Sequence, residues 1–487
     1  MSQRQIPSTI DYSTILPLSV PAIAKRQKFY PANGGQFNWA QNQEIRIPVS
    51  SVNSLLDAQH SYLDFAVTNN GVNSFGPDLG GGWNFFEQLR IEQGGRVLSQ
   101  THDVNRLFAS VLNPCQESSE GRATEGIKGS ARAYNGPGAA STAVQPFNTT
   151  SDGYTLARHN HQAYFAAAVG GITHRMTCSI PNGLFTQDKL IPLPLVDQNA
   201  PITIVLTLAP TQQVGCWAGA PAAGDISVGD VSYVAQLIEV GNDVIDQFRA
   251  VQDMFGGQVV LSGQDWEYSA ANVPAGTTGS VDLRLPVRKR SIKSVFWVAQ
   301  SNDYANTGGL VESTSYSLSF SGQMNIASWG LKFGSVVYPS TPVRGIGNTA
   351  VFGSEFRRGE SVMELAKAFG TLGYENPTGT LSTLTYGTDS GGMANGDNGI
   401  GGVARVPVSN EVCNVCPNGV STEAFARSIT ESGVDVETLA QETYLTLNWE
   451  GGAVPITSGI EDKVVHMWVL YDQHYYFNKD GSITYSN

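Results

Sequence analysis

The sequence predicts an all-β chain built from two tandem β-sandwich or barrel domains. Three short motifs each occur twice, in the same order. The offset is 238 residues from position 44 to 282, 242 from 89 to 331, and 239 from 206 to 445, close to half of the 487 residues. Repeats of this length are whole domains rather than solenoid units. The motif pairs are Glu44–Val49 with Asp282–Val287, Leu89–Ile91 with Leu331–Phe333, and Leu206–Leu208 with Leu445–Leu447.

Composition favours the same fold class. The chain has 53 Gly and 23 Pro with few long helical patterns, which is typical of many short strands joined by turns. Charged residues make up 15%, below the usual ~25%. A surface with so few charges indicates that neighbouring molecules cover much of it.

Charge and cysteine usage disfavour several classes of protein. A net charge of −13 makes the whole chain a poor binder of polyphosphate. The chain has no apolar run of ~18 residues, which predicts no membrane span, and its first residues lack the apolar region of a secretory signal. Five scattered Cys argue against a disulfide scaffold. The simplest compartment is the cytosol, or a particle assembled there.

Residues 1–38 are predicted to form an N-terminal arm. Four prolines prevent a continuous helix, and Lys25, Arg26 and Lys28 form a small basic cluster. The arm could contact a neighbouring subunit, a membrane surface or a genome, or it could be a solvated tail.

The first domain is predicted over 39–242. The paired glycines Gly94 and Gly95 indicate a tight hairpin, and apolar residues at helical spacing predict a short helix over Asp103–Leu112. A polar excursion follows over about 116–160, a length typical of functional or disordered loops. The strands are expected at Glu44–Val49, Ser61–Thr68, Glu87–Ser99, Ile202–Leu208 and Val231–Val240.

Residues 243–256 are predicted to connect the two domains as a helix or an extended segment, and the second domain is predicted over 257–487. A second amphipathic helix is expected at Glu360–Phe369, followed by an excursion over about 370–421, and Asp480-Gly481 should turn the last hairpin. The strands are expected at Val281–Val287, Ser294–Ala299, Tyr316–Phe320, Trp329–Tyr338, Thr443–Trp449, Val464–Tyr471 and Tyr475–Tyr485.

The first motif also predicts where its strands lie. Alternation puts Ile45, Ile47 and Val49 on one face and Arg46 on the other. Proline cannot donate to a β ladder, so Pro48 and Pro286 should lie at a sheet edge, a bend or a strand end.

No set of residues predicts catalysis, cofactor binding or a metal site. Cys413 and Cys416 have the spacing of half a zinc site, but a lone pair is a weak signal because zinc needs four ligands. His159, His161 and His174 lack an acidic partner at informative spacing.

Three further patterns are interpreted as ordinary structure. Gly345–Ala350 resembles a dinucleotide loop but lacks the surrounding βαβ unit. Asp389 and Asp397 lack the acidic ladder of a calcium loop. Asn148 begins a glycosylation sequon, which matters only in a secretory route.

Several stretches resemble the double jelly-roll major capsid proteins of icosahedral double-stranded DNA viruses, the lineage of virophages, Polinton-like viruses and large DNA viruses. Gly183–Phe185, Leu190–Leu195 and Ile202–Leu206 are similar in order and character to the end of the first jelly roll. Trp329–Leu331 with Val336–Pro339 is similar to part of the second, and Ser61–Phe65 to an early strand.

The resemblance implies two tandem jelly rolls with short helices and long apical loops. It implies a non-enzymatic virion subunit that forms a homotrimer, builds pseudo-hexameric capsomers and contacts neighbouring capsomers, penton proteins and minor capsid proteins. It implies no cofactor and no small-molecule substrate. The alternatives are a secreted two-domain glycan-active enzyme or lectin, and a virion spike module.

Overall fold

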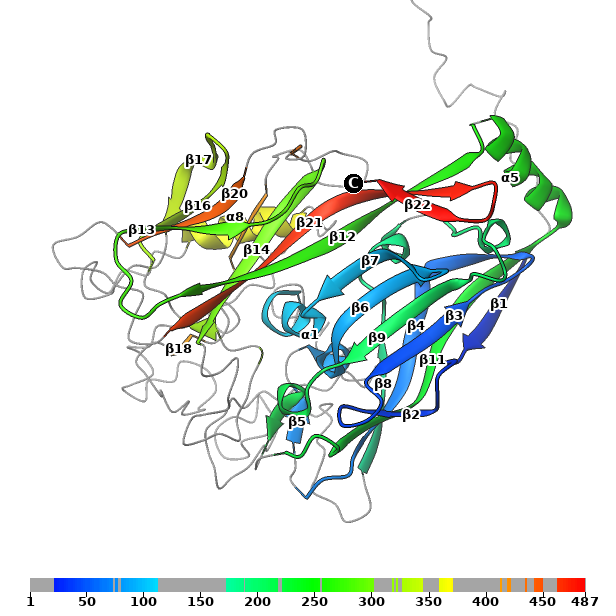
Figure 1. The fold of residues 1–487 in the computed structure, drawn as a ribbon, viewed down its shortest axis with the longest axis horizontal. Helices are drawn as coiled ribbons and strands as arrows, with labels where there is room; N and C mark the ends of the chain where they lie inside the picture. Colours follow the sequence, from blue (N-terminus) through cyan, green and yellow to red (C-terminus); the bar gives the residue numbers. More distant parts are fainter. Residues whose placement is uncertain are drawn as a thin grey trace, which may run out of the picture.

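Figure 1 shows the computed structural model of the chain, which describes most residues of the two β domains. The described residues are 22–72, 75–77, 80–112, 172–187, 189–217, 221–254, 256–301, 318, 321–322, 326–344, 359–370, 412–413, 418–421, 434–435, 442–449 and 462–486.

The first half is a jelly roll of two facing antiparallel sheets. One sheet has the order β1-β11-β4-β8, with β2 also paired to β11, and the other has the order β3-β9-β6-β7. We call these sheets the first roll. Its strands are β1 (Ala22–Phe29), β2 (Gln36–Asn38), β3 (Glu44–Val49), β4 (Ser54–Asn69), β6 (Phe86–Gln93), β7 (Arg96–His102), β8 (Ile172–Cys178), β9 (Ile202–Leu208) and β11 (Ile226–Val240).

The second half repeats this topology. Its sheets have the orders β12-β21-β14-β19, with β22 paired to β21, and β13-β20-β16-β17. We call them the second roll. Its strands are β12 (Gln258–Val273), β13 (Ser280–Leu285), β14 (Ile292–Ser301), β16 (Ser328–Phe333), β17 (Val336–Arg344), β19 (Asn418–Ser421), β20 (Thr443–Asn448), β21 (Lys463–Asn478) and β22 (Ile483–Ser486).

Short elements connect the strands. The 3-10 helices are η1 (Gly81–Phe85), η3 (Leu184–Thr186), η4 (Leu193–Leu195) and η5 (Thr211–Gln213), and η2 (Leu107–Leu112) is a π-helix. The α-helices are α1 (Val104–Arg106), α5 (Asn242–Met254) and α8 (Gly359–Gly370), and the remaining short strands are β5 (Phe75–Pro77), β10 (Gly215–Trp217), β15 (Ser321–Gly322) and β18 (Val412–Cys413).

The three repeated sequence motifs lie on equivalent strands and in register with one another. In the first roll, Leu206 of β9 pairs with Ile45 of β3 on one side and with Leu89 of β6 on the other. In the second roll, Leu445 of β20 pairs in the same way with Leu283 of β13 and Leu331 of β16. The tandem repeat predicted from the sequence is therefore confirmed residue by residue across three adjacent strands.

Both motif prolines lie where the missing donor costs no ladder hydrogen bond. β3 and β13 are edge strands of their sheets. Pro48 lies within edge strand β3, and Pro286 follows the last residue of β13. The hairpin glycines are also confirmed, since Gly94 and Gly95 join β6 to β7 with φ of 56° and 83°.

Each roll has its own apolar core. Ile45, Leu89 and Leu206 pack with Leu63 and Phe65 between the sheets of the first roll, and all five are fully buried. Leu283, Leu331 and Leu445 pack with Trp297 and Met467 in the second roll. Burial of such side chains stabilises each by ~1.5–3 kcal/mol, so the same alternating motif supports both cores.

The structure corrects three assignments. Residues 22–38, predicted to belong to the arm, contain strands β1 and β2 paired to β11, so the described part of that segment belongs to the first roll. The two strands predicted at Val464–Tyr471 and Tyr475–Tyr485 are instead β21, which runs unbroken over Lys463–Asn478, and β22. The stretch 370–421 contains β18 and β19.

Both predicted amphipathic helices are confirmed, as α1 with η2 and as α8. Residues 242–254 form helix α5 between the two rolls, where the sequence left a helix or an extended segment open. The strand predicted at Tyr316–Phe320 and the excursion 116–160 lie outside the described residues, apart from Leu318.

Candidate functional site

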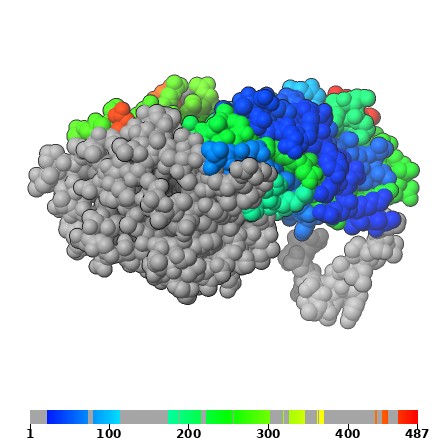
Figure 2. Space-filling view, turned by 90° about the horizontal axis from the view of Figure 1, so that it is seen from below, coloured from blue at the N-terminus to red at the C-terminus, as the bar shows by residue number. Residues whose placement is uncertain are grey.

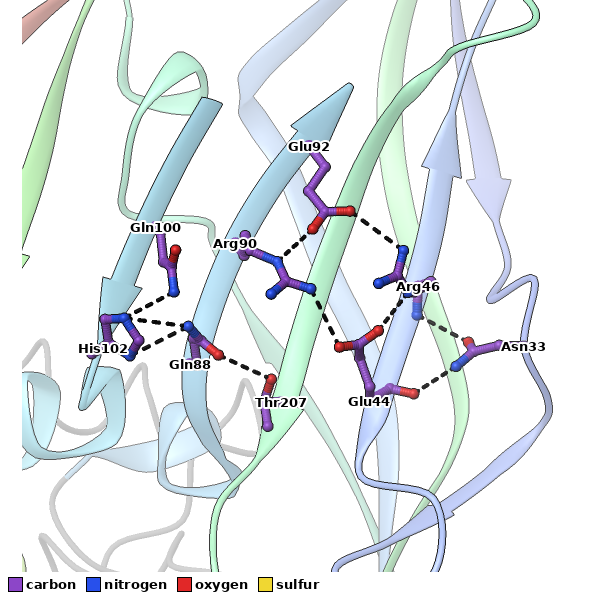
Figure 3. Close-up of polar contacts among 9 residues, drawn as sticks. All are labelled: Asn33, Glu44, Arg46, Gln88, Arg90, Glu92, Gln100, His102 and Thr207. Carbon is purple, nitrogen blue, oxygen red and sulfur yellow. Dashed lines mark hydrogen bonds and ion pairs between the residues drawn. The ribbon is translucent and has the colours of Figure 1, made fainter. Parts of the chain in front are cut away.

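A ring of four alternating charges lies on the outer face of sheet β3-β9-β6-β7 (Figure 3). Glu44 and Arg46 of β3 face Arg90 and Glu92 of β6 across the central strand β9. Arg90 bridges Glu44 at 3.3 Å and Glu92 at 2.6 Å, and Arg46 bridges Glu44 at 2.5 Å and Glu92 at 3.4 Å. The pKa of Arg46 is raised above its usual value, chiefly by its hydrogen bond to Glu44. Each charge is thus balanced within the sheet.

Polar groups extend this surface on both sides of the ring (Figure 3). Asn33 accepts a hydrogen bond from the Arg46 amide at 3.0 Å and donates to the Glu44 carbonyl at 2.6 Å, so it occupies free backbone groups of edge strand β3. On the other side of the ring of charges, Gln88 and Gln100 contact the imidazole of His102. The Nε2 atom of Gln100 lies 2.8 Å from the Nε2 atom of His102.

The second roll carries an equivalent charge pair at equivalent positions. Asp282 and Lys332 correspond to Glu44 and Arg90 in the strand register, and they form an ion pair at 2.9 Å across β20. Thr446 donates to Asp282 at 2.6 Å, and chiefly this bond, with help from Lys332, lowers the pKa of Asp282. The repeat therefore extends beyond the cores to solvent-facing positions.

The predicted basic cluster is paired within the first roll. Lys25 forms an ion pair with Glu239, Arg26 donates to the Tyr62 hydroxyl at 2.9 Å, and Lys28 bridges Asp64 at 3.0 Å. These contacts hold edge strand β1 against its sheet.

Asp64 is shared between two cations on the outer face of that sheet. Arg175 of β8 also bridges Asp64, at 3.1 Å, and continues to Asp230 at 2.6 Å. Burial of Asp64 opposes ionisation, but hydrogen bonds from Arg175 and Lys28 outweigh it and hold the pKa of this carboxyl below its usual value. The face of β1-β11-β4-β8 is thus a second paired-charge surface.

The two rolls meet where β7 contacts β12 (Figure 1). Asp265 of β12 is buried there and accepts hydrogen bonds from the Ser99 hydroxyl at 2.9 Å and from Asn182 at 3.5 Å, both in the first roll. The Tyr471 hydroxyl donates to its second oxygen at 3.4 Å. Burial raises the pKa of Asp265 to about 6, against the hydrogen bonds from the Trp266 amide, Ser99 and Asn182 and the charge of Lys289.

Close backbone contacts accompany this carboxylate. The Gly183 amide donates to the Gln264 carbonyl at 2.8 Å, and Gln473 donates to the Leu98 carbonyl at 3.0 Å. A Cβ on Gly263 would lie 2.3 Å from the Gly183 carbonyl oxygen, so only glycine permits this approach.

The apolar part of the junction lies on the outer face of sheet β12-β21-β14-β19. Leu107, Val111 and Leu112 of η2 pack there with the aromatic rings Trp266, Phe296 and Trp468. Leu365, Ala368 and Phe369 of α8 join the same cluster. Strand β21 is therefore buried on both faces, which explains its continuous apolar pattern.

Buried polar side chains centred on His466 lie beside this apolar cluster. Arg106 donates to His466 Nδ1 at 3.1 Å and bridges Asp103 at 3.0 Å, while the Tyr268 hydroxyl lies 2.7 Å from the same ring nitrogen. Burial, and then the charge of Arg106, lowers the pKa of His466 well below its usual value. His466 is therefore a neutral acceptor in the junction.

The residues weighed as chemical candidates are not brought together among the described residues. His174 lies in β8 opposite Val67, and Cys413 of β18 pairs through its backbone with Ser321 of β15. The remaining candidates, His159, His161, Cys416, Gly345–Ala350, Asp389, Asp397 and Asn148, lie outside the described residues.

Sequence reasoning did not find the junction residues Asp265, Asn182 and His466. The side chains that contact each of them lie far away in the chain, so no local spacing identifies these residues. The described ranges contain no group of three or more His, Cys, Asp or Glu side chains placed to hold a metal ion. No helix within those ranges is long and apolar enough to cross a membrane.

Comparison with known proteins gives likenesses of fold over nearly the whole chain. A chain of the PBCV-1 virus capsid superposes with a TM-score of 0.54 and 11% identity, covering 98% of this chain and 99% of that chain. PBCV-1 VP54, as fitted into the virophage Sputnik, gives 0.52 and 11% with the same coverage. A chain of the Sputnik virophage structure gives 0.50 and 9%, over 100% of this chain and 93% of that chain. No protein-family model and no curated protein sequence matches the chain.

Proposed function

We propose that this chain is a major capsid protein, a structural subunit that forms homotrimers and tiles an icosahedral virus shell. The observation that carries the proposal is the in-register duplication, in which Ile45, Leu206 and Leu89 correspond to Leu283, Leu445 and Leu331 across equivalent strands. The likeness in fold to a PBCV-1 capsid chain over 98% of this chain supports it.

Duplication has a geometric consequence for assembly. A chain with two similar rolls, repeated three times around a threefold axis, presents six similar units to its surroundings. Such a capsomer is pseudo-hexameric, so it can occupy a hexagonal lattice while ordinary threefold symmetry closes the oligomer. Jelly rolls suit this role because their facing sheets leave only short strand edges free.

The role is structural rather than enzymatic, and it needs no cofactor or small-molecule substrate. The partners are other copies of the chain, neighbouring capsomers, and penton and minor capsid proteins, and the place of action is the virion capsid. No arrangement among the described residues favours a glycan-active enzyme, a lectin or a spike module over this function.

The structure changes the contact proposed for the N-terminal segment. Lys25, Arg26 and Lys28 are already paired within the first roll. The charged side chains of residues 1–21 are Arg4 and Asp11, whose charges cancel. A contact of 1–21 with a neighbouring subunit, a membrane or a genome would therefore depend on uncharged groups rather than on a cluster of positive side chains.

Purified chain tests the function directly. Sedimentation and light scattering should give a homotrimer, and electron microscopy after concentration or coexpression with penton proteins should give hexagonal arrays or closed shells. A chain that stays monomeric at tens of micromolar, with both rolls folded, would contradict the proposal.

A further inference from the structure

Helix α5 joins the two rolls and is anchored to both of them by one of its faces. Ile245 is 6% exposed in a small apolar cluster with residues of the first roll. Gln252 is 4% exposed and donates to the Phe477 carbonyl of the second roll at 3.0 Å. Phe248 lies half-buried on the same face. These contacts fix the position of the helix and leave its opposite side towards solvent.

A second row of α5 side chains, which we call the α5 stripe, is largely exposed. Val244, Gln247, Val251 and Met254 follow one another at spacings of three, four and three residues, so they lie along one side of the helix. Val244 is half-buried, whereas Val251 and Met254 are 38% and 82% exposed. Alternating spacings of three and four are those of a seam between two packed helices. The pattern of the α5 stripe therefore indicates a helix as its partner.

The surface around the α5 stripe carries an excess of acidic charge. Two ion pairs lie there, Arg249 with Asp246 at 3.5 Å and Lys479 with Asp253 at 2.7 Å. Two further acids are exposed, one in the first turn of α5 and one directly after Lys479. These two acids are Asp243 and Asp480. Their charges exceed those of the two bases, so a partner with positive side chains fits this surface.

Helix α5 projects at one extremity of the molecule (Figure 1), at the end of the first roll opposite to the entry of the excursion 116–160. That excursion precedes β8, whose first residue Ile172 pairs with Asn69 at the end of β4. The residue before the α5 segment is Val240, whose amide donates to the Asn53 carbonyl just before β4 begins. The 16 residues of β4 span about 50 Å. If the excursions are apical, α5 faces the interior of the proposed shell.

Several other occupants fit the α5 stripe poorly. The excess acidic charge repels the phosphates of a genome or of an anionic membrane. Two copies of α5 packed against each other would bring their acids together.

The N-terminal segment 1–21 enters the fold near α5, because Ala22 pairs with Val240. Figure 2 shows the N-terminal residues, in blue, on the surface towards the same end of the molecule. Pro7 and Pro17 nevertheless interrupt any helix of this segment that is long enough to follow the α5 stripe. A helix from a different protein is the better match.

We propose that the α5 stripe docks an amphipathic helix of another capsid protein, one that carries lysine or arginine beside its apolar residues. Val251 and Met254 pack against the apolar side of that helix, and the acids of α5 meet its basic side chains. The 13 residues of α5 offer a contact about 20 Å long. This inference rests on the proposed function and names the surface that binds an inner partner.

Titration with a defined peptide tests the chemistry of the α5 stripe. The probe is a fluorescent synthetic helix of about three heptads, with leucine at the core positions and lysine beside them. A matched probe carries glutamate in place of lysine. With the full chain, fluorescence anisotropy should show binding of the lysine probe, weakened by salt, and no binding of the glutamate probe. Equal binding of both probes, or binding of neither, would overturn the inference.

Two matched substitutions test the position of the site. Met254→Lys places a positive charge on the α5 stripe, and Met363→Lys makes the same change on α8, where the methionine is 55% exposed. The first should weaken binding of the lysine probe by about tenfold or more, the usual effect of losing a central contact, and the second should leave it unchanged. Both variants should keep the Tm of the unaltered chain, because both side chains are exposed. Equal affinities of the two variants would place the site elsewhere.

Photocrosslinking in assembled particles identifies the occupant. Met254 is replaced by the photoreactive residue benzoylphenylalanine, the particles are irradiated, and the crosslinked peptide is sequenced by mass spectrometry. The expected adduct joins α5 to a segment of another capsid protein with apolar residues at helical spacing and lysine or arginine beside them. An adduct within residues 1–21, with another copy of this chain, with lipid or with nucleic acid, or no adduct at all, would overturn the inference.

The readouts separate this inference from the proposed function. An unaltered chain that stays monomeric contradicts the function itself, as measured by sedimentation and light scattering. An unaltered chain that forms trimers and shells but does not distinguish the two probes contradicts only the assignment of the α5 stripe as a docking site.

Discussion

Asp265 is a buried carboxyl at the junction of the two rolls, and its burial opposes ionisation. Burial raises the pKa of its carboxyl to about 6, whereas an unfolded Asp titrates near 4. Between about pH 4 and pH 6 the native chain therefore holds more protons at this site than the unfolded chain. This site favours folding in acid, and its contribution falls as pH rises through that window.

His466 acts in the opposite direction. Its pKa lies well below the usual value because of burial and then Arg106, so below about pH 6.5 the unfolded chain binds a proton that the native chain does not. The contribution of His466 to stability is thus lost as pH falls. The two residues partly cancel, and a substitution is needed to separate them.

We predict that Asp265→Asn removes the acid-favouring contribution. Relative to the unaltered chain, the variant should become more stable as pH rises from 4.5 to 7.5, by about 2–3 kcal/mol at most, since one pKa unit is worth ~1.4 kcal/mol. Urea unfolding at both pH values measures the difference. Asp253→Asn, at an exposed site on α5, should show a nearly constant difference, and a constant difference for Asp265→Asn would contradict the assignment.

At the scale of elements, the outer-face charge pairs and the helices contribute differently. Glu44–Arg90 and Asp282–Lys332 are exposed to the extent of a fifth to two fifths of each side chain. Such pairs stabilise by about 0–1 kcal/mol and weaken with salt. The two rolls are therefore held together by apolar and buried polar contacts rather than by these surface ion pairs. Helix η2 contributes Leu107, Val111 and Leu112 to the apolar contacts.

We predict that Leu107→Ala in η2 lowers the free energy of unfolding by about 2–5 kcal/mol, the usual range for truncating a fully buried leucine. The cavity would open where η2 packs on Trp266, Phe296 and Trp468, so the loss falls on the junction. Denaturant unfolding followed by tryptophan fluorescence measures it. Val251→Ala, at a 38% exposed site on α5, is the matched control and should change stability by well under half as much.

At the scale of the whole molecule, the two excursions leave equivalent places. The stretch 116–160 lies between β7 and β8, and most of 370–421 lies between β17 and β19, which are equivalent strands of the two rolls. Since equivalent connections leave the same end of a jelly roll, we predict that both lie on the same side of a capsomer, away from the shell interior.

Limited proteolysis of assembled particles measures this exposure. The first cuts should fall within 116–160 and 370–421, because polar segments of this kind are preferred protease sites. Early cleavage within β13 or β14, which carry buried core residues, would contradict the assigned orientation.

Deletions separate strand β1 from the segment before it. We predict that removing 1–21 leaves the Tm of the monomeric chain unchanged. The reason is that β1 remains, together with its side-chain contacts to Glu239, Tyr62 and Asp64. Removing 1–30 takes away all of β1 and frees the edge of β11, so the Tm should fall and aggregation should increase. Equal melting temperatures for the two deletions would show that β1 does not stabilise the first roll.

The sequence by itself determined the all-β class, the duplication and the positions of most strands. The reason is physical: alternation at Ile45, Ile47 and Val49 depends only on the two-residue period of a strand, and edge prolines such as Pro48 reflect a missing donor. Both signals are local and survive in both copies. The same holds for the glycine hairpin at Gly94-Gly95, which needs a positive φ.

Only the tertiary structure decided what the charged and junction residues do. Lys25 and Lys28 looked like a free basic cluster, but their partners Glu239 and Asp64 come from distant strands that no local pattern connects to them. The pKa values of Asp265 and His466 are shifted because these side chains are buried between the rolls. Long-range pairing and desolvation depend on how two domains pack, and that information is not present in the period or spacing of any one segment.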